Sequence, residues 1–450
     1  MNIRAKLATV AGKSTKFVLE KTRGGGSSMP GKVAMKIDPA VLEELSKDYR
    51  VVMITGTNGK TLTTSFITKI FQAKFGNVLT NPTGANMLQG IVSCFLGADT
   101  KKGETKYAVL EVDEATLKHV TKYIKPEVVV FTNLFRDQMD RYGEIDTTYA
   151  LMREGIALAP NATIIANGDL PMFSSVKLDN PVEYFGFAHK EDEEQTAHYN
   201  TDGILCPVCD NVLHYKLLTY ANLGKFYCPH CDFKRPELKH AVTAIRSLTP
   251  ESSCFDIDGE TFDLPIAGLY NIYNALAAYS VAKHFEIDDR YIKRGFDAAQ
   301  RVFGRQEHIN IGGKDVVMNL IKNPVGFNQI VDLLATDSAD FSLVSLLNDR
   351  PADGTDVSWI WDGDFEKLVS LTTGRPVVLS GIRVEDLSTR FEVAGLSKNE
   401  QVLEQDLSKL ADLIKQAPTK KVYILATYTA TLELRHILAE QGYLKEGKGR

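Results

Sequence analysis

The fold is decided by the stretch Val51-Val52-Met53-Ile54-Thr55-Gly56-Thr57-Asn58-Gly59-Lys60-Thr61. Its first four residues are apolar and predict a buried strand, and the apolar spacing from Phe66 to Phe71 predicts an amphipathic helix behind it. A glycine-rich turn between a strand and a helix presents backbone N–H groups and the positive helix end to an anion. We therefore predict a nucleotide-phosphate site formed by Thr57, Asn58, Gly59, Lys60 and Thr61.

Two side chains of this loop have specific expected roles. Lys60, which we expect on an exposed loop, would supply charge to the terminal phosphates, and the Thr61 hydroxyl would coordinate Mg²⁺. Two residues separate Gly56 from Gly59, whereas the standard phosphate-binding loop has four between its glycines. A chance glycine turn is the alternative, and the adjoining strand, lysine, threonine and helix together disfavour it.

Further apolar runs alternate with helical patterns along the chain, which predicts a mostly parallel sheet covered on both faces. A second, smaller Rossmann-like α/β unit is predicted after Arg305. The expected divisions are a basic segment (1–45), an ATP-binding α/β domain (46–305) and a C-terminal α/β domain (306–450). The predicted strands are 108–110, 128–131, 163–166, 316–320, 341–346, 377–379 and 422–425, and the predicted helices include Asn271–His284, Glu404–Lys415 and Leu432–Gln441.

Composition narrows the class of protein. The chain has 450 residues, enough for about three domains of ~150 residues. It is 44% hydrophobic and 24% charged, and 57 acidic against 52 basic residues give a net charge of −5, so the overall charge does not indicate nucleic-acid binding. No run of about 20 apolar residues predicts a membrane-spanning helix, and no secretory signal is recognisable. We expect a cytoplasmic enzyme.

The N-terminal segment is strongly basic. Residues 1–36 carry eight Lys or Arg residues and one acid, Glu20, and the apolar side chains of Ile3, Leu7, Val10 and Phe17 recur at helical spacing. One hypothesis is an amphipathic helix that contacts the anionic inner face of the plasma membrane. The alternative is a solvated helix packed on the next domain.

Four of the six cysteines form two C-x2-C pairs, Cys206/Cys209 and Cys228/Cys231, with eighteen residues between the pairs. This spacing is typical of a tetrahedral zinc site. A polar stretch at about 200–240 surrounds them, and we predict a zinc ribbon inserted into the first α/β domain. The other two cysteines, Cys94 and Cys254, lack the glycine-flanked turn that would expose a nucleophilic thiol, so we expect both to be buried and structural.

Acidic residues follow two of the predicted strands. Glu111, Asp113 and Glu114 come directly after one strand, and the stretch from Asn133 to Asp140 follows the next. The carboxyl ends of parallel strands converge on the ligand crevice of an open sheet. Since Mg²⁺ takes few direct carboxylates, Glu111 beside Thr61 would suffice as a magnesium ligand. For Asp113 and Glu114, solvated loop charge is an equal alternative.

The motifs together resemble the Mur ligases and folylpolyglutamate synthases. Thr55–Thr61 is similar to their ATP loop, residues 132–143 (TNLFRDQMDRYG) to their second signature, 268–278 (GLYNIYNALAA) to their asparagine-bearing helix and 304–307 (GRQE) to their domain junction. The resemblance implies that Mg·ATP activates a carboxylate as an acyl phosphate, which an amine then attacks. It also implies nucleotide contacts from Asn271, Asn274 and Arg305, with Lys60 and Glu111 in the catalytic machinery.

The chain departs from that family at several points. Gln138 stands where a histidine is usual, which puts a second metal in doubt, and a carbamylated lysine cannot be placed. About fifty residues precede the loop, fewer than a nucleotide-sugar-binding domain needs, and the cysteine insertion is foreign to most members. One branch shares these departures: the Mur-ligase-like subunits of the lipid II isoglutaminyl synthases. Its features here include residues 322–328 (KNPVGFN) and 348–362 (NDRPADGTDVSWIWD).

Resemblance to this branch implies ATP-dependent amidation of the D-glutamate α-carboxylate of lipid II, in peptidoglycan synthesis. Ammonia would come from a separate glutaminase subunit, GatD, in a heterodimer. Asp356 would complete the Cys–His pair of that partner in trans by orienting its imidazole. A helix cap or turn is the alternative role for Asp356 and for nearby Asp353. On spacing alone Trp359-Ile360-Trp361 predicts a core strand, and its adjacency to Asp356 favours an interface.

Two other functions remain as alternatives. One is a stand-alone ligase that adds an amino acid, as folylpolyglutamate synthases do, and the zinc insertion and residues 353–362 count against it. The other is a non-catalytic ATP-binding scaffold whose cysteine ribbon docks nucleic acid or protein. The net acidity and the intact Lys60-Thr61 pair count against that.

Overall fold

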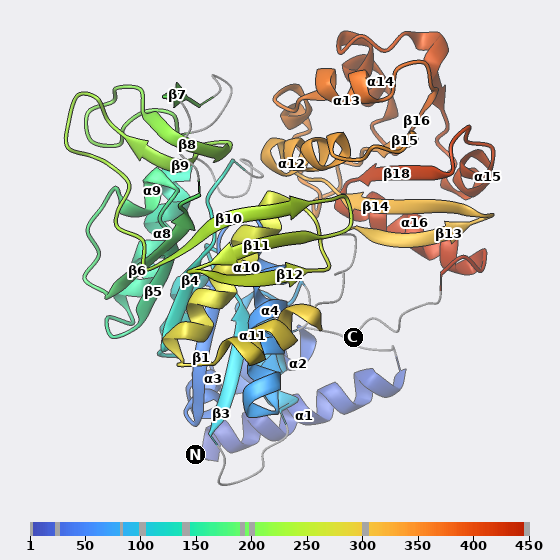
Figure 1. Ribbon diagram of the computed structural model, residues 1–450. Coiled ribbons are helices and arrows are strands. Elements are labelled where there is room, and N and C mark those ends of the chain that lie inside the picture. Colours follow the sequence, from blue (N-terminus) through green and yellow to red (C-terminus); the bar gives the residue numbers. More distant parts are fainter. Residues whose placement is uncertain are drawn as a thin grey trace.

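The computed structural model describes residues 3–22, 28–81, 84–98, 105–136, 145–189, 194–197, 203–298 and 306–444. In these residues two α/β units and a small ribbon are distinguishable, and the first α/β unit holds the central sheet (Figure 1). This sheet has nine described strands in the order β12-β11-β10-β6-β5-β4-β1-β3-β2. Their bounds are β1 Tyr49–Thr55, β2 Val78–Thr80, β3 Lys106–Glu111, β4 Val128–Phe131, β5 Thr163–Asn167, β6 Val182–Phe187, β10 His240–Leu248, β11 Ser253–Ile257 and β12 Glu260–Leu264.

The sheet is parallel around β1 and antiparallel at one edge. β1 pairs in parallel with β3 on one side and β4 on the other. β10 continues the parallel pairing through β6, and then β11 and β12 run antiparallel to their neighbours. The predicted parallel sheet is therefore confirmed at its centre, where strands buried on both faces must be continuously apolar.

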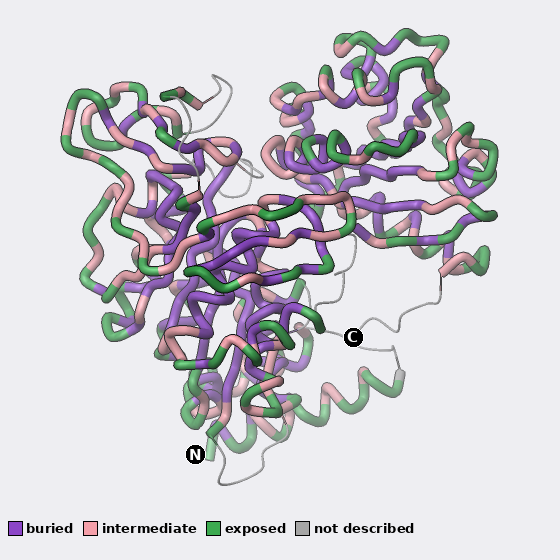
Figure 2. Tube along the Cα trace, viewed as in Figure 1, coloured by how far each residue is buried: buried purple, intermediate pink, exposed green. Residues whose placement is uncertain are grey.

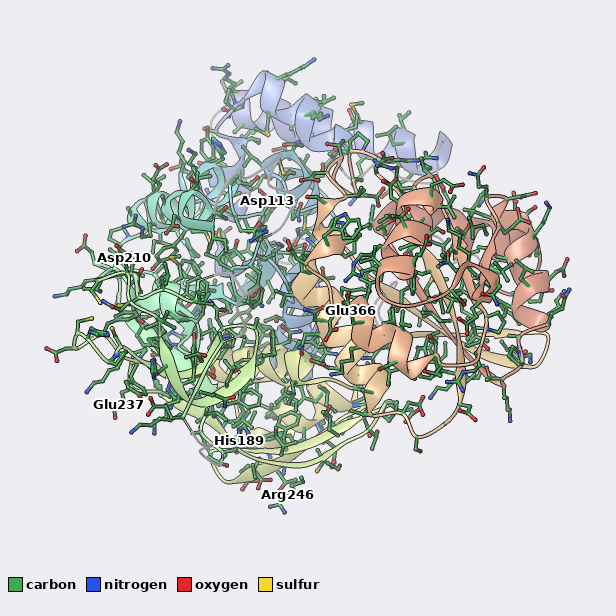
Figure 3. All side chains as sticks on the ribbon, turned by 90° about the horizontal axis from the view of Figure 1, so that it is seen from above. Asp113, His189, Asp210, Glu237, Arg246 and Glu366 are labelled. Atoms are coloured by element: carbon green, nitrogen blue, oxygen red, sulfur yellow. The ribbon has the colours of Figure 1, made fainter. Side chains whose placement is uncertain are left out.

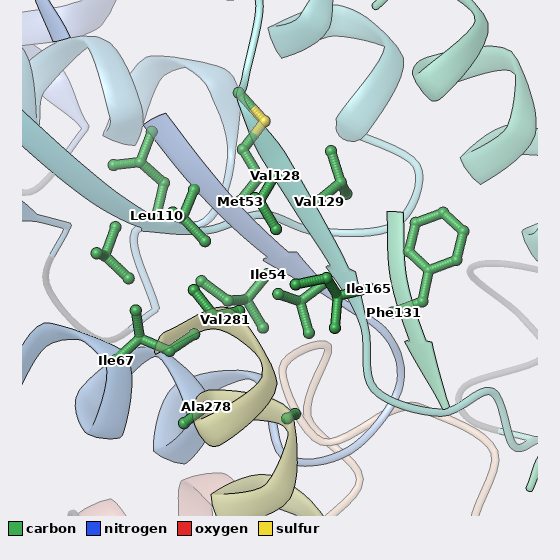
Figure 4. Close-up of a cluster of buried hydrophobic side chains, with 14 of the residues drawn as sticks. Met53, Ile54, Ile67, Leu110, Val128, Val129, Phe131, Ile165, Ala278 and Val281 are labelled. Carbon is green, nitrogen blue, oxygen red and sulfur yellow. The ribbon is translucent and has the colours of Figure 1, made fainter. Parts of the chain in front are cut away.

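Three helices, α4 (Lys60–Phe75), α10 (Leu269–His284) and α11 (Asp289–Asp297), pack together over one face of this sheet. Figure 4 shows Ile67 of α4 and Val281 of α10 facing Ile54 and its neighbours on the strands. The central strands β1, β3, β4 and β5 are buried along almost their whole length (Figure 2). The other described helices of this unit are α1 Ile3–Thr22, α2 Met29–Ile37, α3 Val41–Ser46, α5 Leu88–Leu96, α6 Leu117–Thr121, α8 Ile145–Ala157 and α9 Pro171–Ser174.

The ribbon is a three-stranded antiparallel sheet of β7 (Gln195–Thr196), β8 (His214–Tyr220) and β9 (Leu223–Tyr227). Its small core gathers Tyr215 and Phe226 with the paired cysteines. Gly224 N donates to Asp169 O at 3.0 Å, and Arg235 Nη1 donates to the buried carboxylate of Asp169 at 2.9 Å. These bonds attach the ribbon to the central unit.

The second α/β unit has six described strands in the order β13-β14-β18-β15-β16-β17, all parallel except β13. It lies beside the antiparallel edge of the central sheet (Figure 1). The bounds are β13 Glu307–Ile311, β14 Lys314–Leu320, β15 Phe341–Leu346, β16 Val377–Ser380, β17 Gln401–Leu403, β18 Lys421–Ala426, α12 Pro324–Ala335, α13 Phe365–Leu371, α14 Val384–Val393, α15 Leu410–Lys415 and α16 Tyr428–Glu440, with 3₁₀ turns η1 Ser358–Trp361, η2 Lys398–Glu400 and η3 Leu407–Lys409.

Two predictions for this unit were wrong. The expected helix Glu404–Lys415 is a 3₁₀ turn followed by the short α15, because strand β17 ends only at Leu403. The expected core strand at Trp359-Ile360-Trp361 is the 3₁₀ turn η1, in which Ile360 is buried and Trp361 is 51% exposed. Among the described helices, none has the length and apolarity to cross a membrane.

Candidate active site

The candidate site lies where β1, β3 and β4 end side by side. Because the three strands are parallel neighbours, the loop after β1, Glu111 at the end of β3 and Asn133 after β4 share one edge of the sheet. Figure 3 shows Asp113 of the same edge near the centre of the molecule, where the two α/β units meet. The structure thus brings together the loop and the acidic residues that the sequence singled out.

The loop requires its two glycines. Gly56 and Gly59 have φ values of +128° and +85°. A Cβ on Gly59 would lie 2.0 Å from Asn274 Oδ1, and a Cβ on Gly56 would lie 2.4 Å from Thr132 Oγ1. Glycine is therefore needed for backbone conformation and for close approach.

Asn133 holds the loop in place. Its carbonyl accepts from Thr57 N at 2.8 Å, and its side-chain Oδ1 accepts from Asn58 N at 2.8 Å. Within the described residues the N–H groups of Gly59, Lys60 and Thr61 have no hydrogen-bond partner. Three free N–H groups at the start of α4 fit an anionic phosphate.

Lys60 is not on an exposed loop, contrary to the prediction. Its side chain is 13% exposed, and Nζ donates to Glu114 Oε1 at 2.8 Å and to Gly56 O at 2.5 Å. Burial alone would lower the pKa of Lys60, but the carboxylates of Glu114, Glu111 and Asp113 outweigh it and raise that pKa. Lys60 is therefore a buried ammonium group whose charge the neighbouring carboxylates stabilise.

Glu111 is held beside this pair. Its backbone N–H donates to Asn81 Oδ1 at 2.9 Å, Asn81 Nδ2 donates back to its carbonyl, and Asn86 Nδ2 donates to Glu111 Oε1 at 3.2 Å. The carboxylate is buried yet keeps an oxygen for a cation. A half-buried Thr61 hydroxyl and one oriented carboxylate are a donor set that suits Mg²⁺.

Asn271 and Asn274 on α10 meet the loop from the opposite side. Asn274 Oδ1 accepts from Thr63 Oγ1 at 3.3 Å, and Asn274 Nδ2 donates to Asn271 Oδ1 at 3.2 Å. Both side chains are buried, Asn274 lies against Gly59 of the loop, and Asn271 Nδ2 donates to Ala267 O at 2.6 Å. Arg305, the remaining predicted nucleotide contact, lies outside the described residues, as does Gln138 of the second signature.

The second α/β unit contacts the loop directly. Asn323 Nδ2 donates to Asn58 Oδ1 at 3.1 Å, and Arg136 Nη1 forms an ion pair with Asp362 at 3.0 Å. Between the units lies a cavity of about 70 Å³, lined by Asn58, Gly59, Asn323 and Tyr220 among others. The loop is therefore closed over by residues from both units and the ribbon.

The four paired cysteines converge as predicted. All four sulfur atoms lie within 4.8 Å of one another, and the contacts Cys206–Cys231, Cys209–Cys228 and Cys209–Cys231 measure 3.6, 3.5 and 3.6 Å. Four thiolates around Zn²⁺ at a Zn–S distance of about 2.3 Å would be spaced by about 3.8 Å. The cluster fits a closed tetrahedral zinc site. It belongs to the ribbon, whose Asp210 lies at the molecule's edge away from the second unit (Figure 3).

Asp353 and Asp356 differ sharply. Asp353 is buried, and its carboxylate accepts from Arg350 N at 3.2 Å, from Thr429 N at 2.7 Å and from the Thr429 hydroxyl. Asp356 is exposed; its Oδ1 accepts from Ser358 N at 2.8 Å, and this bond lowers its pKa. Asp353 therefore ties its loop to the start of α16, while Asp356 presents an ionised carboxylate at the surface.

The isolated cysteines offer no nucleophile. Cys94 is buried, as expected, and burial raises its pKa to about 12. Cys254 is only half-buried, contrary to the prediction, because it lies on β11 near the edge of the sheet, and desolvation still raises its pKa. A thiol with a raised pKa carries little thiolate at neutral pH.

Sequence reasoning gave too little weight to Glu114 and Asn323. Glu114 was part of the acidic run, but nothing in its spacing distinguished an ion-pair partner from a solvated turn residue. Asn323 precedes Pro324 and caps α12, with its Oδ1 accepting from Gly326 N at 2.8 Å. An Asn-Pro pair is typical of a helix start, and only the fold shows that Asn323 also reaches Asn58.

Comparisons with known proteins agree with this geometry. The Mur ligase middle domain family matches residues 54–228, and the MurT ligase C-terminal family matches residues 320–431. The chain is 45% identical over 446 residues to the lipid II isoglutaminyl synthase (glutamine-hydrolyzing) subunit MurT of Streptococcus pneumoniae (strain ATCC BAA-255 / R6), covering 99% of both chains. It is 36% identical over 391 residues to the subunit of the same name from Staphylococcus aureus (strain N315), covering 86% of each.

The fold is also that of solved Mur ligases. The crystal structure of MurF from Acinetobacter baumannii matches with a TM-score of 0.64 at 16% identity, over 91% of this chain and 80% of that one. At this identity the likeness concerns the fold alone.

Proposed function

The chain belongs to the MurT family of lipid II isoglutaminyl synthase subunits, and from this premise we propose how its residues carry out the reaction. It is an ATP-dependent carbon–nitrogen ligase of peptidoglycan synthesis that amidates lipid II. A carboxylate oxygen of the stem-peptide D-glutamate attacks the γ-phosphorus of ATP, and ADP leaves. Ammonia then attacks the acyl carbon and phosphate leaves, which yields D-isoglutamine. The arrangement that carries the proposal is the loop after β1, where three N–H groups have no partner among the described residues and the Lys60 ammonium group is held against the same loop.

The roles of individual residues follow from their contacts. Thr57, Asn58, Gly59, Lys60 and Thr61 would hold the nucleotide phosphates, with Asn271 and Asn274 supporting the loop and Arg305 contributing from the junction. Thr61 and Glu111 would hold Mg²⁺, which would neutralise phosphate charge when bound. Lys60 would stabilise the charge that develops on the transferred phosphoryl group. Its partner Glu114 keeps the ammonium group aimed at the loop.

Ammonia comes, in this proposal, from a glutaminase partner, GatD, bound to the second α/β unit. Two observations support this. The isolated cysteines, Cys94 and Cys254, have raised pKa values and the other four form the candidate zinc cluster, and Asp356 is an exposed carboxylate with a depressed pKa. Half-exposed Trp361 lies five residues further on, and tryptophan is enriched at binding hot spots. The heterodimer would work at the inner face of the plasma membrane, where the substrate's lipid resides.

A reconstitution experiment tests the proposal. Conversion of D-glutamate to D-isoglutamine in lipid II is measured with ATP and glutamine, with and without the glutaminase partner. We expect product only with both chains when glutamine is the donor, and with this chain alone when ammonia is supplied. A stand-alone amino-acid ligase would instead add an amino acid and show no glutamine dependence. An ATP-binding scaffold would give no product under any of these conditions.

We also expect one structural Zn²⁺ per chain, held by Cys206, Cys209, Cys228 and Cys231. Cys228→Ser should lose the metal and unfold the ribbon locally, because zinc binding supplies folding free energy of order 10 kcal/mol in small zinc domains. Elemental analysis and proteolysis of residues 203–235 measure both effects. Cys254→Ser, outside the cluster, is the matched control and should keep its zinc. Freshly purified parent protein without zinc would contradict the prediction.

A further inference from the structure

Helix α1 has an unusual distribution of side chains. The face that packs on the protein is formed by small residues: Ala5 and Ala8 are fully buried, and a Cβ on Gly12 would come within 2.5 Å of Leu96 Cδ1 on α5. α1 also packs along α2, and Gly31 N of α2 donates to Ser93 Oγ of α5 at 2.8 Å. The helix is thus firmly attached through its small residues.

The large apolar side chains of α1 point away from the protein. Ile3, Leu7, Val10 and Phe17 are 79%, 59%, 65% and 58% exposed. At 3.6 residues per turn these positions form one stripe, on the side opposite Ala5, Ala8 and Gly12. An ordinary surface helix buries its large apolar residues, whereas α1 buries small residues and exposes its large apolar ones. The alternative hypothesis, a solvated helix packed on the next domain, is confirmed in its packing but does not account for this exposed apolar stripe.

Cations border the stripe. Arg4, Lys6, Lys13 and Lys21 are exposed on α1, and Glu20 is the only acid in the helix. The stripe is narrow and about 21 Å long from Ile3 to Phe17, and α1 runs along an outer edge of the molecule (Figures 1 and 3). A linear apolar stripe flanked by Lys and Arg suits the boundary between anionic headgroups and acyl chains.

We propose that α1 docks this enzyme on an anionic lipid bilayer by inserting Ile3, Leu7, Val10 and Phe17 between the headgroups while its lysines contact lipid phosphates. The purpose of the docking rests on the proposed function, since a lipid-linked substrate must reach the site from the bilayer. The connection to the site is short. α1 packs on α5, and the segment that leads into α5 contains Asn86, which bonds to Glu111.

Vesicle co-sedimentation of the full-length chain in complex with its glutaminase tests the docking. Vesicles of phosphatidylglycerol and phosphatidylcholine (3:7) are compared with pure phosphatidylcholine. We expect Leu7→Gln/Val10→Gln/Phe17→Gln to weaken binding to the anionic vesicles at least about 10-fold. Lys6→Gln/Lys13→Gln should weaken it about 30-fold, because each cation near an anionic surface contributes about fivefold. Binding of the parent should fall as salt rises.

The controls separate docking from folding and from catalysis. Leu158→Gln/Val176→Gln/Leu432→Gln removes three exposed apolar side chains elsewhere and should bind as the parent does. The α1 triple variant should keep the parent's melting temperature and its rate on a lipid-free stem peptide, while its rate on vesicle-borne lipid II falls. If the parent protein amidates neither the lipid-free stem peptide nor vesicle-borne lipid II, the proposed function is wrong. The vesicle-binding measurement still tests the docking proposal in that case.

Equal vesicle binding by the parent and the α1 triple variant would overturn the docking proposal. A change in the size of the complex in the α1 triple variant, with vesicle binding unaltered, would also overturn it and assign the stripe to a protein partner.

Discussion

The Lys60→Ala variant is expected to lose amidation by at least about 10²–10³-fold, which is the usual cost of removing one preorganised group that stabilises transition-state charge. Its effect on folding is expected too. Lys60 Nζ pairs with the buried carboxylate of Glu114, whose pKa burial raises, so removing Lys60 leaves a buried acid that must stay unpaired or take up a proton, at a cost of about 3 kcal/mol. The rate of ATP-dependent product formation and the thermal unfolding midpoint are the two measurements.

The double variant Lys60→Ala/Glu114→Gln separates the two effects. Neutralising Glu114 removes the buried charge, so the unfolding midpoint should return close to that of the parent. Amidation should stay as low as in Lys60→Ala, because the charge aimed at the phosphates is still missing. A double variant that recovers both stability and activity would mean that Lys60 serves the fold alone.

Strands could be predicted because burial on both faces of a parallel sheet demands a continuous apolar run. Phe341–Leu346 and Val128–Phe131 were found with their bounds. The predicted helix Glu404–Lys415 was wrong because the apolar spacing continues from the edge strand β17 through a 3₁₀ turn into α15. Over so short a stretch, periodicity does not distinguish a strand, a 3₁₀ turn and an α-helix. Where a strand ends depends on the strand with which it pairs, and the apolar pattern of one segment does not contain that information.

The site residues could be predicted where the groups that form a site lie close together in the chain. A glycine-rich loop between a strand and a helix, or two C-x2-C pairs, bring their own ligands close together in the chain. The Lys60–Glu114 and Asn58–Asn323 contacts join residues 54 and 265 positions apart, and the fold alone determines them. Lys60 was placed on an exposed loop because the sequence does not show that three carboxylates surround it.

The N-terminal helix shows a different limit. Its periodicity correctly predicted a helix with an apolar stripe, but a stripe in the sequence does not say which face meets the protein. Ala5, Ala8 and Gly12 decide that, since small residues permit close helix packing and leave the larger side chains outside. The same holds for Trp361, which was assigned to a core strand on alternation and lies on an exposed turn next to Asp356.

The second large effect is expected for Asp356→Asn, in the complex with the glutaminase. If Asp356 orients a histidine of the partner, the amide favours the wrong imidazole tautomer, and that change costs about 10⁴-fold in a serine protease triad. Glutamine-driven amidation should fall by about that factor. Assembly should be spared, because asparagine has the same shape and retains an oxygen to accept from Ser358 N. Ammonia-driven amidation should be unchanged, since Lys60, Thr61 and Glu111 are untouched.

Asp353→Asn is the matched control, three residues away in the same loop. Asp353 is buried and accepts from the Thr429 N–H and hydroxyl, so an amide in its place loses a charge-assisted bond that holds the loop to α16. We expect this variant to melt earlier and to lose glutamine- and ammonia-driven rates alike. The deciding measurement is the ratio of the two rates in each variant against the parent. A misplaced loop lowers both rates, whereas an imidazole in the wrong tautomer lowers only the glutamine-driven rate. An unchanged ratio of the two rates in Asp356→Asn would therefore show that this carboxylate does not act in the glutaminase site.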